Sequence, residues 1–88
     1  MNLFNIRIEN ELEKKMIKLK KKDKILYTAL YKKVLQLMEN PYLGKPLRNV
    51  LKNKRRVHIG PFVLIYEINE KEKEIVLLKF EHHDKVYK

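Results

Sequence analysis

The chain has 88 residues and no cysteine, and its 21 Lys and Arg against 11 Asp and Glu give a formal net charge of +10. This length is enough for one domain, residues 1–88, and excludes a second independent core, while the lack of cysteine excludes a disulfide framework and a thiolate metal site. The excess of positive charge favours a polyanionic partner: nucleic acid, an anionic membrane or an acidic protein.

Hydropathy along the chain argues for a location in the cytoplasm. Residues 1–10 alternate polar and apolar residues and lack the apolar centre of a signal peptide. No stretch approaches the roughly 18 consecutive apolar residues of a membrane span. We therefore expect a cytoplasmic protein without a membrane partner.

The start of the chain predicts a strand followed by a helix. Leu3–Glu9 alternates apolar and polar residues, which is the period of a half-buried strand. Asn10 and Glu13 have the spacing of a helix start in which the Asn side chain caps the first turn and the Glu side chain reaches back. The apolar residues of this helix form a single narrow stripe: Leu12, Met16 and Leu19.

A second helix is predicted from Asp23 to Glu39. Asp23 follows a run of lysines and is a suitable N-cap. Apolar residues then recur at helical spacing: Leu26, Ala29, Leu30, Leu37 and Met38. Asn40-Pro41 ends the helix, because the residue before a proline is displaced from the α region, and a loop continues through Leu47.

From Lys52 onward the apolar period changes to two residues, which predicts strands. These strands are Lys52–Ile59, Phe62–Ile68, which is apolar on both faces, and Ile75–Phe80, followed by a polar tail over residues 81–88. Gly60-Pro61 marks the turn between the first two. The order βααβββ indicates an α+β fold in which an N-terminal helical hairpin packs on one face of an antiparallel sheet.

The first of these three strands is strongly cationic. Alternation projects Lys54, Arg56 and His58 to one face, with alternate residues about 7 Å apart, so this face can follow a nucleic-acid backbone. We take as further RNA-binding candidates the basic residues beside them: Arg48, Lys52 and Arg55. The alternative is a solvated edge strand whose lysines discourage aggregation.

The tail contains a second group of candidates, His82-His83-Asp84 and Tyr87. Cleavage of RNA by its own 2′-hydroxyl needs a base, cations for the phosphorane and an acid for the leaving oxygen, and histidine suits either proton transfer. One alternative is a metal site of His82, His83 and Asp84, although adjacent histidines on an extended segment point to opposite faces. Another is a polar tail without chemistry. We expect no metal and no cofactor.

Three segments together resemble the RelE/ParE superfamily of toxins over essentially the whole chain. Their order, spacing and the total length carry the resemblance: residues 40–47, 55–67 and 82–87. The resemblance implies a RelE-like fold and a toxin that enters the ribosomal A site and cleaves the bound messenger RNA. It also implies neutralisation by a cognate antitoxin that wraps the toxin. ParE-like relatives on the same fold inhibit DNA gyrase.

The resemblance also implies roles for single residues. The basic second strand matches the RNA-facing position of the family, where Lys52, Lys54 and Arg56 hold phosphates and stabilise the transition state. Tyr87 matches the terminal tyrosine that RelE-like toxins use near the scissile phosphate. His83 is expected to take the proton of the 2′-hydroxyl.

Two positions depart from the family pattern. Val63 stands where the central strand usually has an arginine, and His82-His83 stands where the tail usually reads His-Arg. Two guanidinium groups are thereby lost, and neither lysine nor imidazole copies their bidentate phosphate contacts. We expect that a chain without these two arginines either retains RNA cleavage or cleaves more weakly.

The sequence therefore predicts a toxin of a type II toxin–antitoxin system that cleaves messenger RNA on the ribosome and inhibits translation. The expected catalytic residues are Arg56, His83 and Tyr87, and the expected RNA-binding residues are Arg48, Lys52, Lys54, Arg55, His58 and His82. Expected partners are an acidic, neutralising, RelB-like antitoxin, the ribosome and messenger RNA. The alternative is a non-cleaving toxin of the same fold that inhibits gyrase or occupies the ribosome.

Overall fold

The computed structural model describes residues 3–47 and 53–86 and has a sheet with helices on both sides. In this part of the chain the sheet has five strands in the order β1-β5-β4-β3-β2. The elements in chain order are β1 (Asn5–Ile8), α1 (Asn10–Lys22), α2 (Lys24–Glu39), a 3₁₀ turn η1 (Pro41–Leu43), β2 (Lys45–Pro46), β3 (Lys54–Ile59), β4 (Phe62–Asn69), β5 (Glu74–His82) and α3 (His83–Val86).

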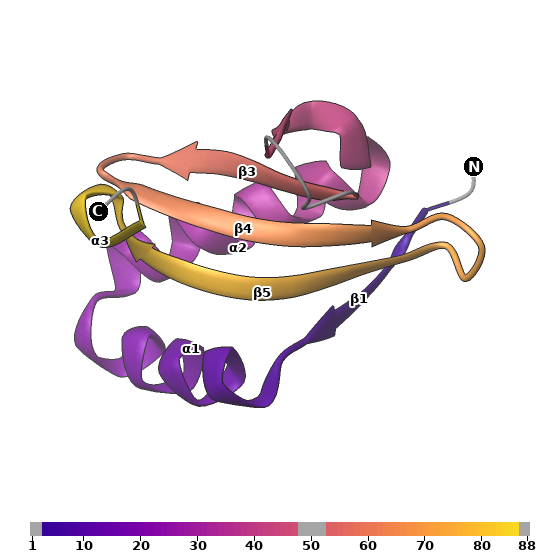
Figure 1. Cartoon of the computed structure of the whole chain (residues 1–88). Helices are drawn as coiled ribbons and strands as arrows, with labels where there is room; N and C mark the ends of the chain where they lie inside the picture. The colour runs from indigo at the N-terminus through magenta and orange to yellow at the C-terminus, as the bar shows by residue number, and fades with distance from the viewer. Residues whose placement is uncertain (1–2, 48–52, 87–88) are drawn as a thin grey trace.

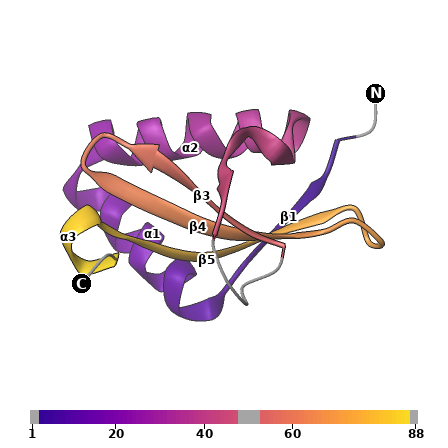
Figure 2. The ribbon, with the colours of Figure 1, turned by 45° about the horizontal axis from the view of Figure 1, so that its top comes forward.

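The two faces of the sheet are different. Helices α1 and α2 lie behind the sheet and α3 lies in front of it, as the two views agree (Figure 1, Figure 2). We call the side covered by α1 and α2 the inner face and the opposite side the outer face. The predicted α+β fold, with a helical hairpin on one face, is confirmed.

The sheet is antiparallel with one exception. Strands β2 to β5 pair antiparallel, but β1 pairs parallel with β5, from Asn5 opposite Glu74 to Ile8 opposite Leu77. The expectation of an antiparallel sheet is confirmed for β2 to β5 and was wrong for β1, because side chains alternate in the same way in parallel and antiparallel strands. The expected loop before β3 also contains the two-residue strand β2.

The helix starts confirm one predicted cap and contradict the other. The Asp23 side chain accepts a hydrogen bond from the Leu26 backbone N–H at 3.0 Å, as a capping residue does. Helix α1 already includes Asn10, and its N-cap is Glu9, which makes no side-chain cap hydrogen bond. The backbone N–H of Glu9 donates to the Leu77 carbonyl at 3.0 Å, which continues the pairing of β1 with β5. The helix therefore caps at Glu9, one residue before the predicted cap Asn10.

The core lies between the inner face and the two long helices. Helix residues Leu12, Leu30 and Leu37 are at most 3% exposed. They pack with residues that alternate along β4 and β5: Leu64, Tyr66, Ile68, Ile75, Leu77 and Phe80. Since the stripe of α1 is narrow and α2 supplies most of the helical core, both helices are needed to cover the sheet.

A β-bulge decides which residues of β5 face outward. Leu64 is opposite Phe80 and Ile65 is opposite Lys79, but Tyr66 is opposite Leu77. The extra residue on β5 is therefore Leu78, and it lets Leu77 and Phe80 both face the core. As a consequence Lys79 lies on the outer face.

Tyr66 ties the loop before β2 to the centre of the sheet. Its buried hydroxyl donates a hydrogen bond to the Pro41 carbonyl at 2.6 Å and accepts one from the Gly44 N–H at 3.0 Å. A Cβ atom on Gly44 would lie 2.5 Å from the Arg56 carbonyl oxygen and 2.6 Å from the Tyr66 hydroxyl, so only glycine fits. This close packing places β2 beside β3.

Candidate nucleic-acid interface and active site

Strand β3 presents its basic residues to both sides of the sheet. Val57 and Ile59 belong to the core, so their neighbours Lys54, Arg56 and His58 project to the outer face. The structure thus brings these three predicted residues to one surface. It is the surface on which α3 also lies (Figure 1).

Lys54 is held by an acidic neighbour on the outer face. Its Nζ donates to Glu67 Oε1 at 2.9 Å, across the β3–β4 register pair Lys54–Glu67. Both side chains are partly exposed, 30% for Lys54 and 38% for Glu67. The negative charge of Glu67 therefore weakens the attraction between Lys54 and a phosphate group.

Arg55 points to the inner side and contributes to the fold. Its guanidinium donates to the Gly44 carbonyl at 2.7 Å and lies 5.1 Å from the centre of the Tyr42 ring. Through these two contacts Arg55 on β3 holds the 3₁₀ turn and the start of β2 in place. The structure does not bring Arg55 to the face of Lys54 and Arg56.

His58 and His83 form the most specific juxtaposition on the outer face. Their rings stack with centroids 5.8 Å apart and an interplanar angle of 30°. His83 begins α3, and its backbone N–H donates to the Pro61 carbonyl in the β3–β4 turn at 2.8 Å. His58 is exposed and half of the His83 side chain is accessible to solvent. Two imidazoles therefore lie together beside the cationic strand.

His82 lies on the other side of the sheet. It pairs in register with Phe62, its ring meets the Phe62 ring edge-on at 5.5 Å, and its Nδ1 accepts from the Asp84 backbone N–H at 3.2 Å. The structure therefore does not bring this predicted RNA-binding residue to the face that carries His83. Adjacent histidines on an extended segment do point to opposite faces here, as expected.

The Asp84 carboxylate lies between the two tail histidines. Its oxygens are 3.7 Å from His82 Nδ1 and 3.8 Å from His83 Nδ1. Among residues 3–47 and 53–86, no group of three or more His, Cys, Asp or Glu side chains could hold a metal ion.

The bulge in β5 and the tight turn before β2 add two cations that sequence reasoning missed. Lys45 is opposite Arg56, Arg56 is opposite Ile65 and Ile65 is opposite Lys79, so one cross-strand row runs over four strands. Lys45 and Lys79 are exposed. The cue for Lys79 is Phe80, which breaks the alternation of β5 and requires a bulge to reach the core.

Three predicted site residues lie outside the described part of the chain: Arg48, Lys52 and Tyr87. Val63, which replaces the arginine usual in the family, is 0% exposed and is opposite His58 and Glu81. The valine side chain has no hydrogen-bond donor, so it cannot bind a phosphate as the family arginine can.

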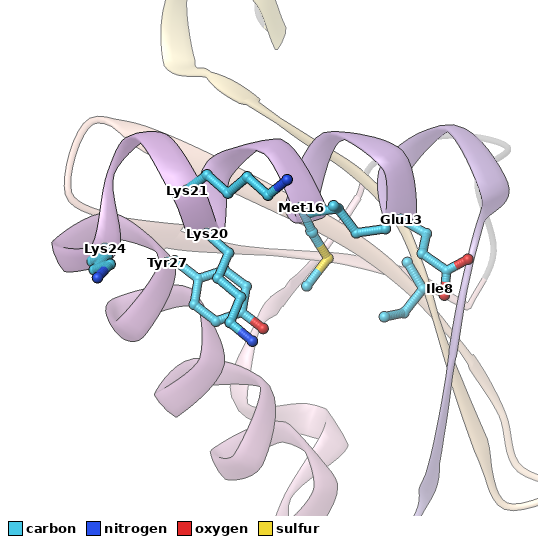
Figure 3. A pocket seen from close by; sticks show the side chains of 8 residues that line it. Ile8, Glu13, Met16, Lys20, Lys21, Lys24 and Tyr27 are labelled. Atoms are coloured by element: carbon cyan, nitrogen blue, oxygen red, sulfur yellow. The ribbon is translucent and has the colours of Figure 1, made fainter.

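A groove lies on the helical side, away from the two stacked histidines. It has a volume of about 620 Å³ and is lined by Ile8, Glu13, Met16, Ile17, Lys20, Lys21, Lys24 and Tyr27. Figure 3 shows Met16 in the middle of the groove, with Ile8 and Glu13 toward one end and Tyr27 and three lysines toward the other: Lys20, Lys21 and Lys24. An apolar floor with a basic end suits an acidic, amphipathic partner better than a nucleic acid. No helix in the described part of the chain is long and apolar enough to cross a membrane.

Comparisons with known proteins agree on the family. Residues 6–87 match the family described as ParE toxin of type II toxin–antitoxin system, parDE. A Methanocaldococcus jannaschii protein named "Putative toxin RelE4" is 38% identical over 87 residues, which are 98% of this chain and 93% of that protein.

Solved structures show the same fold. The RelBE2 toxin–antitoxin complex of Mycobacterium tuberculosis has a chain that matches with a TM-score of 0.77 and 23% identity, over 91% of this chain and 98% of that one. The isolated RelE toxin of Escherichia coli matches with a TM-score of 0.78 and 16% identity, over 90% of this chain and 83% of that one. The chain is therefore a member of the RelE/ParE superfamily, the toxins of type II toxin–antitoxin systems.

Proposed function

We propose that this toxin is a ribosome-dependent endoribonuclease that cleaves messenger RNA and so inhibits translation. The observation that carries the proposal is the stacked pair His58–His83, 5.8 Å between ring centroids, on the same open face as Arg56. Two groups able to transfer protons beside a guanidinium are what RNA cleavage by the 2′-hydroxyl requires.

The chemistry divides between the two imidazoles. His83 takes the proton of the 2′-hydroxyl, the 2′-oxygen bonds to the phosphorus, and the bond from phosphorus to the 5′-oxygen breaks. The protonated ring of His58 gives its proton to that 5′-oxygen. Arg56 stabilises the charge on the phosphorane oxygens. The products are a 2′,3′-cyclic phosphate and a 5′-hydroxyl end, so atoms and charge balance without a metal or cofactor.

Tyr87, Arg48 and Lys52 keep the roles expected from the sequence in this proposal. Tyr87 assists near the scissile phosphate, and Arg48 and Lys52 bind the RNA backbone. Ribosome dependence agrees with the exposure of His58 and His83 to solvent, because the ribosome can then hold and orient the messenger on this face.

The direct test is induced expression of the intact chain in bacterial cells, with primer extension on abundant messages before and after induction. New 5′ ends at in-frame positions within coding regions are expected, together with growth arrest. The same ends should appear when purified toxin is added to messages under translation in vitro. Messages that remain uncut in both assays contradict the proposal.

A second candidate function is inhibition of a target without cleavage, on the ribosome or on DNA gyrase. Val63 favours it, because this buried side chain stands at the position of a family arginine. If His83→Gln leaves growth arrest intact while Arg56→Ala abolishes it, and no new 5′ ends are found, the non-cleaving function is correct.

We further propose an acidic, RelB-like antitoxin as the neutralising partner. Support comes from the net charge of +10, from the groove with three lysines at one end, and from the solved RelBE2 toxin–antitoxin complex, which has a chain of the same fold. Co-expression with the product of the neighbouring gene, followed by gel filtration, should give one complex and relieve growth arrest. Separate elution of the two proteins contradicts this partner.

A further inference from the structure

We propose that single-stranded RNA crosses the strands of the sheet along a row formed by Lys45, Arg56 and Lys79, which we call the cross-strand track. This inference rests on the proposed function and gives the direction of the substrate on the outer face. The sequence alone suggested a path along β3. The tertiary structure favours a path nearly perpendicular to it.

The geometry of the track follows from strand register. Lys45 on β2 is opposite Arg56 on β3, and Ile65 on β4 connects Arg56 in register to Lys79 on β5. With neighbouring strands roughly 4.8 Å apart, the row extends over about 14 Å, long enough for successive phosphates. The side chains at opposed positions lie on the same face of the sheet.

The alternative path along β3 is weakened by the partners that its cations already have. Lys54 is paired with Glu67 at 2.9 Å, and the Glu67 carboxylate would repel a phosphate at that place. Arg55 is used on the inner side by the Gly44 carbonyl. In contrast, Lys45 and Lys79 are exposed and form no ion pair with any residue in the described ranges 3–47 and 53–86.

The stacked histidines favour single-stranded RNA over a duplex as the ligand of the cross-strand track. His58 is one alternation step along β3 from Arg56, about 7 Å, and its ring and that of His83 are accessible. A phosphate held at Arg56 therefore brings its neighbouring nucleotide to these rings, and an unpaired base has a face that can stack on them. A duplex would keep its bases stacked on one another and out of reach.

The test measures binding of the full chain to a fluorescent single-stranded RNA oligonucleotide by anisotropy at several salt concentrations. For the double variant Lys45→Ala/Lys79→Ala we expect affinity to fall about tenfold and the salt slope to fall by about 1.4, which is roughly 0.7 for each phosphate that the protein no longer neutralises. The control Lys32→Ala/Lys71→Ala removes the same charge from α2 and from the β4–β5 turn, and it should bind nearly as the parent does. Circular dichroism of all variants checks that they are folded.

The outcomes separate this inference from the proposed function. Equal reductions of affinity in the two double variants, or tighter binding of a duplex than of the single strand, overturn the cross-strand track. If the track variant binds RNA as well as the parent does while the parent still cleaves translated messages, the track is wrong and the proposed function stands. If the parent neither binds single-stranded RNA nor cleaves translated messages, both fail.

Discussion

The ring of His83 stacks on the ring of His58 at 5.8 Å, and this stacking connects the C-terminal segment to the far end of β3. The two residues are 25 positions apart in the chain, and the β3–β4 turn carries the hydrogen bond from the His83 N–H to Pro61 that brings them together.

Replacement of either stacked histidine by glutamine should lower cleavage of translated messages by about 10²–10⁴-fold, the usual contribution of a proton-transfer group. His82→Gln is the matched control, because His82 packs on Phe62 on the inner side, and its rate should change only a few-fold. The measurement is the rate of appearance of the cleaved 5′ end. Equal rate reductions for His82→Gln and His83→Gln would contradict this assignment.

Glu67→Gln should tighten the binding of single-stranded RNA. The change removes a negative charge from the outer face and releases Lys54 from its 2.9 Å ion pair, so affinity should rise a few-fold at low salt and less at high salt. Stability should change by at most about 1 kcal/mol, as expected for a partly exposed pair. Glu72→Gln in the β4–β5 turn is the control for removal of one acidic charge, and weaker binding by Glu67→Gln would refute the prediction.

Ile17→Glu should weaken the complex with the acidic antitoxin without unfolding the toxin. Ile17 is 57% exposed and lines the groove shown in Figure 3, where a glutamate would repel an acidic partner and remove apolar surface. Ile25→Glu is the control, since Ile25 is 86% exposed and does not line this groove. Titration calorimetry measures the affinity of both variants for the antitoxin. Equal affinities of Ile17→Glu and Ile25→Glu would show that the antitoxin binds elsewhere.

Gly44→Ala should lower the free energy of unfolding by about 1–3 kcal/mol, the usual cost of overpacking. The new Cβ would lie closer to the Arg56 carbonyl and the Tyr66 hydroxyl than van der Waals contact allows a carbon atom, so β2 would have to move. Urea denaturation measures the decrease in stability. An unchanged midpoint would mean that the turn before β2 repacks without cost.

We expect the free energy of unfolding to fall at alkaline pH because of Tyr66. Burial raises the pKa of Tyr66 above its ordinary value of 10.0, against smaller opposing effects of the Gly44 hydrogen bond and the Arg55 charge. Above pH 10 the unfolded tyrosine loses its proton while the folded one keeps it, so the free energy of unfolding falls as pH rises toward the folded pKa. Below pH 10 this contribution is constant.

Tyr66→Phe isolates this effect. The variant should be less stable near neutral pH by about 1–3 kcal/mol, because the Gly44 N–H and the Pro41 carbonyl lose their partner. The difference in unfolding free energy between parent and variant should then shrink from pH 10 upward, since lysines and the other tyrosines titrate in both proteins. A difference that stays constant to pH 11 would contradict the raised pKa.

Local patterns in the sequence determined the secondary structure and the fold class. Alternation identified β1 and β3, Asp23 and Asn40-Pro41 marked the two ends of α2, and the family resemblance agreed with this order of elements. These signals could be read because caps, prolines and apolar periods act within a few residues of the chain. The direction of β1 could not be read, since it depends on which distant strand lies beside it.

Only the tertiary structure decided which candidate side chains meet. Alternation correctly separated His82 from His83 and Arg55 from Arg56, but it could not tell which face carries α3. The pairs His58–His83 and Lys54–Glu67 and the row from Lys45 to Lys79 depend on strand register, and the bulge at Leu78 sets that register for Lys79. A shift of one residue exchanges the two faces of a strand, so the chemistry of the outer face is determined by packing across the sheet and not by spacing along the chain.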